Sequence, residues 1–189
     1  MNSSNSEFQI RRATVADVPR LLELHYRTFD SKTNLLMLLG RPFMAAAFRW
    51  YSQDRNAFAL VAEHGQALAG YVTVNRGSYY YMLKKNWAHV LVAFFLRPKL
   101  LCHQAVVQRF KSLLKPRPAD GVAPRKRACL AYIAVDRENR VKGAGSALVR
   151  AALSECNTRG WSEVITAFHS SNEPARNYLS VRDSTTFRN

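Results

Sequence analysis

Cysteine is scarce in this chain of 189 residues, and its three cysteines, Cys102, Cys129 and Cys156, follow no recognisable spacing. Paired cysteines at short intervals would indicate a zinc site, and a denser set would indicate a secreted disulfide framework. Neither pattern is present, so we expect a protein of the reducing cytoplasm without a metal site. The polar start, Met1–Glu7, holds no apolar core of a signal peptide, and no export is indicated.

Long apolar runs are also missing from the sequence. The most apolar stretch, Ala88–Leu96, is interrupted by His89 and falls far short of the roughly 20 residues that a spanning helix requires. The composition, 48% hydrophobic with 11% aromatic residues, argues against disorder and for a packed core. We therefore predict one domain over residues 1–189.

Acidic residues are few. The chain has 13 Asp and Glu and 28 Lys and Arg, which gives a formal net charge of +15. Residues 76–127 hold 12 of the basic residues and the single acid Asp120, a local net charge of +11. Such a segment favours an anionic partner, which could be a membrane surface, a phosphorylated substrate or nucleic acid. A solvated basic face without a dedicated partner is an equal alternative.

Hydrophobic periodicity predicts the order of the elements in the first part of the chain. Residues 8–75 should form a short strand, two helices and a hairpin of two strands. Thr14 and Asp17 form a capping box at the start of the first helix, and His25 on its apolar face is expected to be packed. Gly70 in the second hairpin strand indicates a bulge or a close backbone approach.

Residues 76–127 are predicted to be a basic helical insert between strands. We expect two short helices, one within residues 87–101 and one over 102–114, and then a loop at 115–121. These aromatic-rich helices could lie on an anionic membrane surface. The alternative, which we favour, is that their apolar face covers the sheet or a second subunit.

A glycine turn in the last part of the chain is the strongest functional signal. The strand Cys129–Val135 leads into Gly143 and Gly145, a helix follows over 146–159, and a parallel strand over 161–168 completes a β-α-β unit. Glycine opens backbone angles closed to other residues, and the N–H groups and dipole of a helix start attract anions.

Two basic residues, Arg140 and Lys142, stand beside these glycines, so the turn predicts a phosphate or pyrophosphate cradle. A plain strand-to-helix turn is the alternative. The turn lacks the Lys-Ser/Thr of a Walker loop, and Leu148 stands where a dinucleotide fingerprint requires a third glycine.

Two patterns resemble those of the GCN5-related N-acetyltransferase (GNAT) family. Arg140-Val141-Lys142-Gly143-Ala144-Gly145 is similar to its Arg/Gln-x-x-Gly-x-Gly/Ala signature, and Asn172-x-x-Ala175, followed by Tyr178, is similar to its Asn-x-x-Ala pattern in the last helix. The resemblance implies the acyl-CoA N-acyltransferase fold of the α/β (α+β) class, a mixed central sheet flanked by helices, over about residues 8–178. It also implies acetyl-CoA as co-substrate.

The resemblance places the acetyl-CoA contacts within residues 128–178. Main-chain groups of Ile133, Ala134 and Val135 would pair with the pantetheine arm. The remaining implied contacts, with the pyrophosphate cradle first, are Arg140, Val141, Lys142, Gly143, Ala144, Gly145, Ser146 and Asn172.

Catalytic candidates are fewer than cofactor contacts. The family's acid for the departing thiolate is a tyrosine seven residues after the asparagine, but here Leu179 holds that position and Tyr178 lies one residue earlier. Tyr178 is therefore a candidate acid whose alternative is a core residue. His169 is the first candidate base, followed by Glu63 and Asp136, and a water chain is a further alternative.

Residues 179–189 depart from the family pattern, and we expect the last strands of the fold to be missing. The leading hypothesis is an acetyl-CoA-dependent N-acetyltransferase that acts on a primary amine of an amino sugar, of another small molecule or of a protein. The alternative is a truncated acyl-CoA-binding or interaction module without activity. A homodimer and a peripheral membrane contact are possible assemblies, and nucleic-acid binding through the insert is the least favoured reading.

Overall fold

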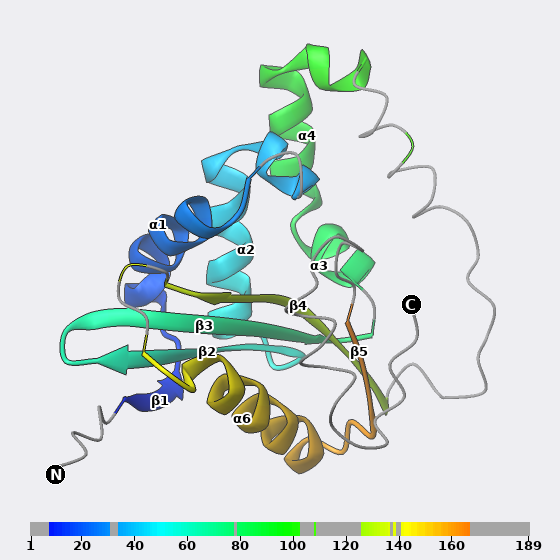
Figure 1. The fold of residues 1–189 in the computed structure, drawn as a ribbon. Helices are drawn as coiled ribbons and strands as arrows, with labels where there is room; N and C mark the ends of the chain where they lie inside the picture. The colour runs from blue at the N-terminus through cyan, green and yellow to red at the C-terminus, as the bar shows by residue number, and fades with distance from the viewer. Residues whose placement is uncertain are drawn as a thin grey trace, which may run out of the picture.

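A mixed β-sheet organises the computed structural model, which describes residues 8–30, 34–77, 79–102, 108, 126–136, 138 and 141–166 (Figure 1). The described residues form five strands in the spatial order β1-β2-β3-β4-β5. The strands are β1 Gln9–Arg12, β2 Ala57–His64, β3 Ala67–Arg76, β4 Arg127–Val135 and β5 Glu163–Thr166. The first three pairings are antiparallel and β4 pairs with β5 in parallel, which confirms the mixed sheet and the β-α-β unit.

Helices cover both faces of this sheet. Figure 1 shows α1 and α2 on one face with α3 beside α2, α6 on the other face, and α4 further from the sheet than α2 and α3. The described helices are η1 Val15–Asp17, α1 Val18–Thr28, η2 Leu35–Leu39, α2 Arg41–Gln53, α3 Tyr79–Lys85, α4 Trp87–Leu96, η3 Pro98–Cys102 and α6 Ala144–Thr158. None of the helices in these ranges is long and apolar enough to cross a membrane.

Two hydrophobic clusters lie on opposite faces of the sheet, because successive strand residues point to opposite sides. Val61, Tyr71 and Ala134 pack with α1 and α2. Leu60 and Val72 pack with Leu148 and its neighbours on α6. Strands β2 and β3 are therefore buried on both faces, which explains why they read as nearly continuous apolar runs.

The predicted helix signals are found where the sequence placed them. Asp17 accepts hydrogen bonds from the main-chain N–H and the hydroxyl of Thr14, at 2.8 and 3.1 Å, and the first turn is a 3-10 turn before α1. At the end of α6, Gly160 has φ +71°, and Trp161 N–H donates to Cys156 O at 2.9 Å. This Schellman closure holds Trp161 in the turn, so β5 begins two residues later than predicted.

Gly70 satisfies both predictions made for it. The pairing of β2 with β3 shifts register between Ala62 and Glu63, next to Gly70. A Cβ at Gly70 would lie 2.8 Å from Ala134 O and 3.1 Å from a Leu148 methyl group. The missing side chain therefore lets β3 approach β4 and α6 closely.

The described part of the insert between β3 and β4 contains α4 within the predicted range 87–101, together with α3 and η3, which were not predicted. Val90 and Ala93 of α4 are buried in the cluster on the α1/α2 face, so one side of α4 covers that layer. The predicted helix over 102–114, the loop over 115–121 and the divergent tail over 179–189 lie outside the described residues.

Candidate functional site

The start of α6 is the best-defined part of the candidate site. Gly143 is its N-cap residue with φ +88°, a conformation that a residue with a Cβ adopts only with strain. An added Cβ at Gly143 would meet nothing within 4 Å, so the backbone and not crowding requires glycine there. The helix begins two residues earlier than predicted, and Ala144 and Gly145 form its first turn.

The N–H groups of Gly145 and Ser146 in the first turn of α6 have no acceptor within the helix and are open to an anion. Ala147 N–H makes the first helical bond, to Gly143 O at 2.9 Å, and a helix offers no i−4 acceptor to the groups before it. Ala144 N–H closes a turn with Val141 O at 3.2 Å. The first turn carries no acidic residue, and the preceding Lys142 is exposed. The dipole of this fifteen-residue helix and Lys142 therefore both favour a negative group.

Gly145 and β4 fix the position of this helix start. A Cβ at Gly145 would lie 3.1 Å from Val135 Cγ2, so a small residue lets the first turn approach the end of β4. The described part of β5 ends at Thr166, opposite Leu130. Ile133, Ala134 and Val135 therefore extend past the last described pairing on the β5 side, and the anion-favouring turn follows them directly.

An arginine on α1 holds the turn after β4. Arg27 donates to Asp136 Oδ2 at 2.9 Å and to Glu138 Oε2 at 3.0 Å. Asp136 is only 3% exposed, and its other oxygen accepts the Glu138 N–H at 3.0 Å. These contacts make Asp136 a structural residue of the turn. Sequence reasoning missed Arg27, because no local pattern links it to residues 109 positions away.

A buried polar cluster lies on the α1/α2 face beside β4. His25 is fully buried, its Nδ1 hydrogen-bonds the Tyr71 hydroxyl, and its Nε2 lies 3.0 Å from Asn34 Nδ2. Because Asn34 Oδ1 accepts the Leu36 N–H, its amide NH2 faces His25 and donates to Nε2. The imidazole is then neutral with its proton on Nδ1, which donates to Tyr71.

Burial lowers the pKa of His25 to about 4 and raises that of Tyr71 well above its usual value of 10. Both groups are therefore neutral near pH 7. The expectation that His25 is packed is confirmed. Tyr71 and Asn34 were not identified from the sequence, since each lies in an apolar run without a motif.

The middle of β4 carries a second irregularity in the sheet. The pairing of β3 with β4 shifts between Thr73 and Val74, which leaves Ala131 as an extra residue. The N–H of Tyr132 donates to Thr73 Oγ1 at 3.1 Å, so a side chain replaces a main-chain partner at the bulge. A bulge bends its strand and redirects the residues that follow, here the predicted acetyl-CoA contacts 133–135.

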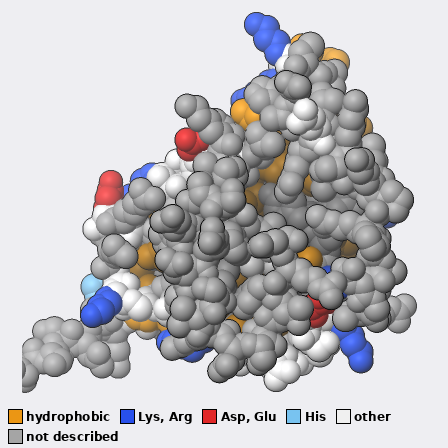
Figure 2. Space-filling view, turned by 45° about the vertical axis from the view of Figure 1, so that its right-hand side comes forward, with side chains coloured by type: hydrophobic (Ala, Val, Ile, Leu, Met, Phe, Trp, Pro, Cys, Tyr) orange, Lys and Arg blue, Asp and Glu red, His pale blue; other side chains and the backbone are white. Residues whose placement is uncertain are grey.

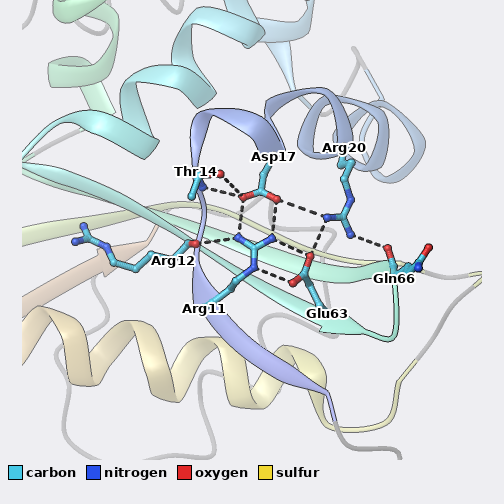
Figure 3. A network of polar contacts seen from close by, with 7 residues as sticks. All are labelled: Arg11, Arg12, Thr14, Asp17, Arg20, Glu63 and Gln66. Carbon is cyan, nitrogen blue, oxygen red and sulfur yellow. Dashed lines mark hydrogen bonds and ion pairs between the residues drawn. The ribbon is translucent and has the colours of Figure 1, made fainter.

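Glu63 belongs to an ion-pair network at the far end of β2 (Figure 3). The Arg11 guanidinium lies between two carboxylates, with Glu63 and Asp17 each at 2.8 Å, and Arg20 donates to Glu63 at 2.8 Å. Arg11, with a smaller contribution from Arg20, holds the pKa of Glu63 below its usual range, and Arg11 with Thr14 holds the pKa of Asp17 well below its usual range. Such a carboxylate is a poor proton acceptor at neutral pH, which argues for a structural role.

The other predicted site residues have no described geometry. Arg140, His169, Asn172 and Tyr178 lie outside the described residues, so their roles stay predictions. Within the described ranges no group of three or more His, Cys, Asp or Glu side chains could hold a metal ion.

The sequence matches the model of the acetyltransferase (GNAT) family over residues 19–181. The chain belongs to this family. Membership confirms three predictions: the acyl-CoA N-acyltransferase fold, an N-acetyltransferase as the type of enzyme, and acetyl-CoA as co-substrate. The sequence matches no curated protein.

Solved structures of GNAT proteins share this fold at low sequence identity. Aminoglycoside N-acetyltransferase AAC(6')-Iy in complex with CoA is 11% identical, with a TM-score of 0.62 over 100% of this chain and 99% of that one. An aminoglycoside acetyltransferase from an uncultured soil metagenomic sample is 14% identical, with a TM-score of 0.58 over 98% and 93%. The ribosomal-protein-alanine N-acetyltransferase of Brucella melitensis biovar Abortus 2308 is 17% identical, with a TM-score of 0.54 over 97% and 96%.

Proposed function

We propose that this GNAT protein transfers an acetyl group from acetyl-CoA directly to a primary amine of a small molecule, with an amino sugar as the preferred acceptor and a protein amine as the next. The observation that carries the proposal is the start of α6, where Gly143 at φ +88° opens a helix whose first turn bears no acid. Such a start fits the pyrophosphate of a coenzyme A group.

Residues on both sides of this helix start complete the proposed acetyl-CoA site. Main-chain groups of Ile133, Ala134 and Val135 would pair with the pantetheine arm. The cradle residues proposed for the pyrophosphate are Arg140, Val141, Lys142, Gly143, Ala144, Gly145 and Ser146, with Asn172 as a further cofactor contact. The bulge in β4 supports this arrangement, because it bends the strand just before Ile133.

In the proposed reaction the neutral amine attacks the thioester carbon. A C–N bond forms as the C–S bond breaks, the amine loses a proton, and the departing thiolate gains one. We propose His169 as the residue that accepts the amine proton and Tyr178 as the acid that protonates the thiolate. The lowered pKa of Glu63 and the structural contacts of Asp136 argue against either as the base.

The first test is thermal unfolding with and without acetyl-CoA, followed by thiol release with a panel of amines. A ligand that binds only the folded state raises the unfolding midpoint as its concentration rises. The panel should contain a hexosamine, a polyamine, an aminoglycoside and a peptide with an N-terminal alanine, the last two suggested by the structural neighbours. A shift with turnover supports the proposal and identifies the acceptor class.

Two other outcomes would contradict parts of the proposal. A shift without turnover on any amine would favour the alternative of a non-catalytic acyl-CoA-binding module. No shift at saturating acetyl-CoA would show that the glycine turn is only a turn.

Tyr178→Phe tests the proposed acid. Loss of the phenol should lower kcat by about a hundredfold to ten-thousandfold, the usual range for a general acid, and leave acetyl-CoA affinity unchanged. Steady-state kinetics with calorimetric binding measures both quantities. An unchanged kcat would assign Tyr178 to the core.

Location and assembly form a second proposal, which does not depend on acetyl transfer. We propose a cytoplasmic protein that contacts an anionic membrane peripherally through residues 76–127, with a homodimer as the competing arrangement. The described part of this insert supports the membrane contact through the exposed apolar side of α4.

A further inference from the structure

The outer side of α4 exposes large apolar side chains. Trp87 is 62% exposed, Phe95 86% and Leu96 68%, while Leu91 and Val92 are more than half exposed. We call these five residues the α4 face. Among the described residues the other exposed large hydrophobic residue is Val15, at 39%.

Helical geometry gathers these residues on one side. At about 100° per residue, Trp87, Leu91 and Phe95 lie within about 80° of arc, and Val92 and Leu96 extend the arc to about half the circumference. Val90 and Ala93, on the opposite side, are buried against the α1/α2 layer. The helix therefore turns an almost wholly apolar side to solvent, which is the reverse of an ordinary surface helix.

Basic side chains flank the α4 face at both ends. Lys84 and Lys85 precede α4, and Arg97 and Lys99 follow it, all of them exposed. The chain contains no acidic residue between Arg76 and Asp120. Figure 2 shows orange apolar and blue basic side chains near the top of the molecule, at the level where Figure 1 places α4.

We propose that the α4 face rests on an anionic lipid bilayer, with its apolar side chains in the interfacial region and the flanking Lys84, Lys85 and Lys99 on the lipid headgroups. Trp87 suits this position, because tryptophan prefers the boundary between apolar and polar layers. Ten residues of helix reach only about 15 Å, so α4 lies on the surface and does not cross it.

Charge favours lipid over a second copy of the chain. A two-fold contact through the α4 face would bring the flanking basic residues of both copies together, in a protein whose net charge is already +15. An anionic bilayer neutralises the same charges. The proposal does not depend on acetyl transfer, so its failure and that of the proposed function are distinguishable.

The test is flotation of the full chain with vesicles of phosphatidylcholine, alone or mixed with phosphatidylserine. We expect binding to the mixed vesicles only, weakening as salt rises, because salt screens the headgroup contacts. The double variant Leu91→Gln with Phe95→Gln should bind at least tenfold more weakly. Its matched control, Val15→Gln, also replaces an exposed apolar residue and should bind as the wild type does.

A second pair of variants separates the charge contribution. Lys84→Gln with Lys85→Gln should weaken binding by about 25-fold, since each basic residue near an anionic surface contributes about a fivefold change in affinity. The control pair, Arg12→Gln with Arg150→Gln, removes the same net charge from exposed positions on β1 and α6. This control should retain nearly all the binding.

Trp87 gives a direct readout of contact. Its emission should shift to shorter wavelength with mixed vesicles, and the shift should vanish in Trp87→Phe, because Trp161 is buried and Trp50 partly buried. No flotation with mixed vesicles would overturn the proposal, as would full binding by the Leu91/Phe95 variant. A wild-type dimer that the same variant converts to a monomer would assign the α4 face to a second copy.

Discussion

The two faces of the sheet are built by different means. On the α6 face, small residues bring a helix start close to the end of β4, and the groups offered to a ligand are main-chain N–H groups. On the α1/α2 face, the polar groups beside β4 are side chains such as His25 and Tyr71, buried in an aromatic cluster. The α6 face presents main-chain groups, and the α1/α2 face holds polar side chains in fixed, buried positions.

This difference separates ligand binding from packing. A backbone cradle recognises a phosphate group by shape and dipole, without a specific side chain. His25 and Tyr71 are fully buried, so their hydrogen bond holds α1 against the sheet. We therefore expect changes on the α6 face to affect acetyl-CoA binding, and changes in the buried cluster of the α1/α2 face to affect stability.

Gly143→Asp should give the largest effect and is aimed at the α6 face alone. The aspartate places a negative charge at the proposed cradle and strains a backbone held at φ +88°. Loss of two charge-assisted hydrogen bonds at about 2 kcal/mol each would weaken acetyl-CoA binding about a thousandfold. Isothermal titration calorimetry with acetyl-CoA measures the change.

Gly160→Asp is the matched control for this variant. Gly160 lies at the other end of α6 with φ +71°, and an added Cβ there also meets nothing within 4 Å. Both variants should lose about 1–2 kcal/mol of stability through backbone strain. Only Gly143→Asp should lose affinity, and an equal loss in both would mean that helix strain, not the cradle, controls binding.

The same contrast explains what the sequence could predict. Glycine turns, helix caps and strand periodicity are local patterns, so the mixed sheet, the α6 helix and the close approach at Gly70 were predictable. The contacts of Arg27 and of His25 join residues 109 and 46 positions apart, and only the folded chain brings them together. The starts of α6 and β5 differed from the prediction by two residues, because Gly143 and Gly160 place the helix boundaries more tightly than apolar periodicity does.

His25 should give the α1/α2 face a distinct response to pH. Its pKa of about 4 in the folded protein lies below the usual 6.5, so protonation favours the unfolded state. Stability should be full above pH 6.5 and fall by about 2 kcal/mol by about pH 5. Protonation of Asp17 and Glu63 lowers stability only below about pH 4.5, because the usual pKa values of these groups are 3.8 and 4.5.

His25→Gln removes this titration and keeps groups that can hydrogen-bond Tyr71 and Asn34. Urea unfolding at several pH values should show a flatter stability curve for the variant between pH 6.5 and about 5, whatever its stability at pH 8. Acetyl-CoA affinity should remain unchanged at pH 8. Parallel curves for variant and wild type would show that another group causes the acid loss.

Arg27→Ala should give the smallest change in acetyl-CoA affinity among these variants. It tests the ion pairs that join α1 to the turn after β4. Arg27 is 42% exposed, and its ion pairs hold the turn that leads from β4 to α6. Without it the turn samples more conformations, and ordering it on binding costs affinity, which we estimate as three- to tenfold.

The matched control is Arg20→Ala on the same helix, which loses ion pairs to Glu63 and Asp17 at similar exposure but at the far end of β2. Both variants should lose comparable stability, about 1 kcal/mol. If acetyl-CoA affinity falls only in Arg27→Ala, the α1/α2 face contributes to the cradle through this residue. If affinity falls equally in both, α1 influences the site only through general stability, and Arg27 has no specific role in the cradle.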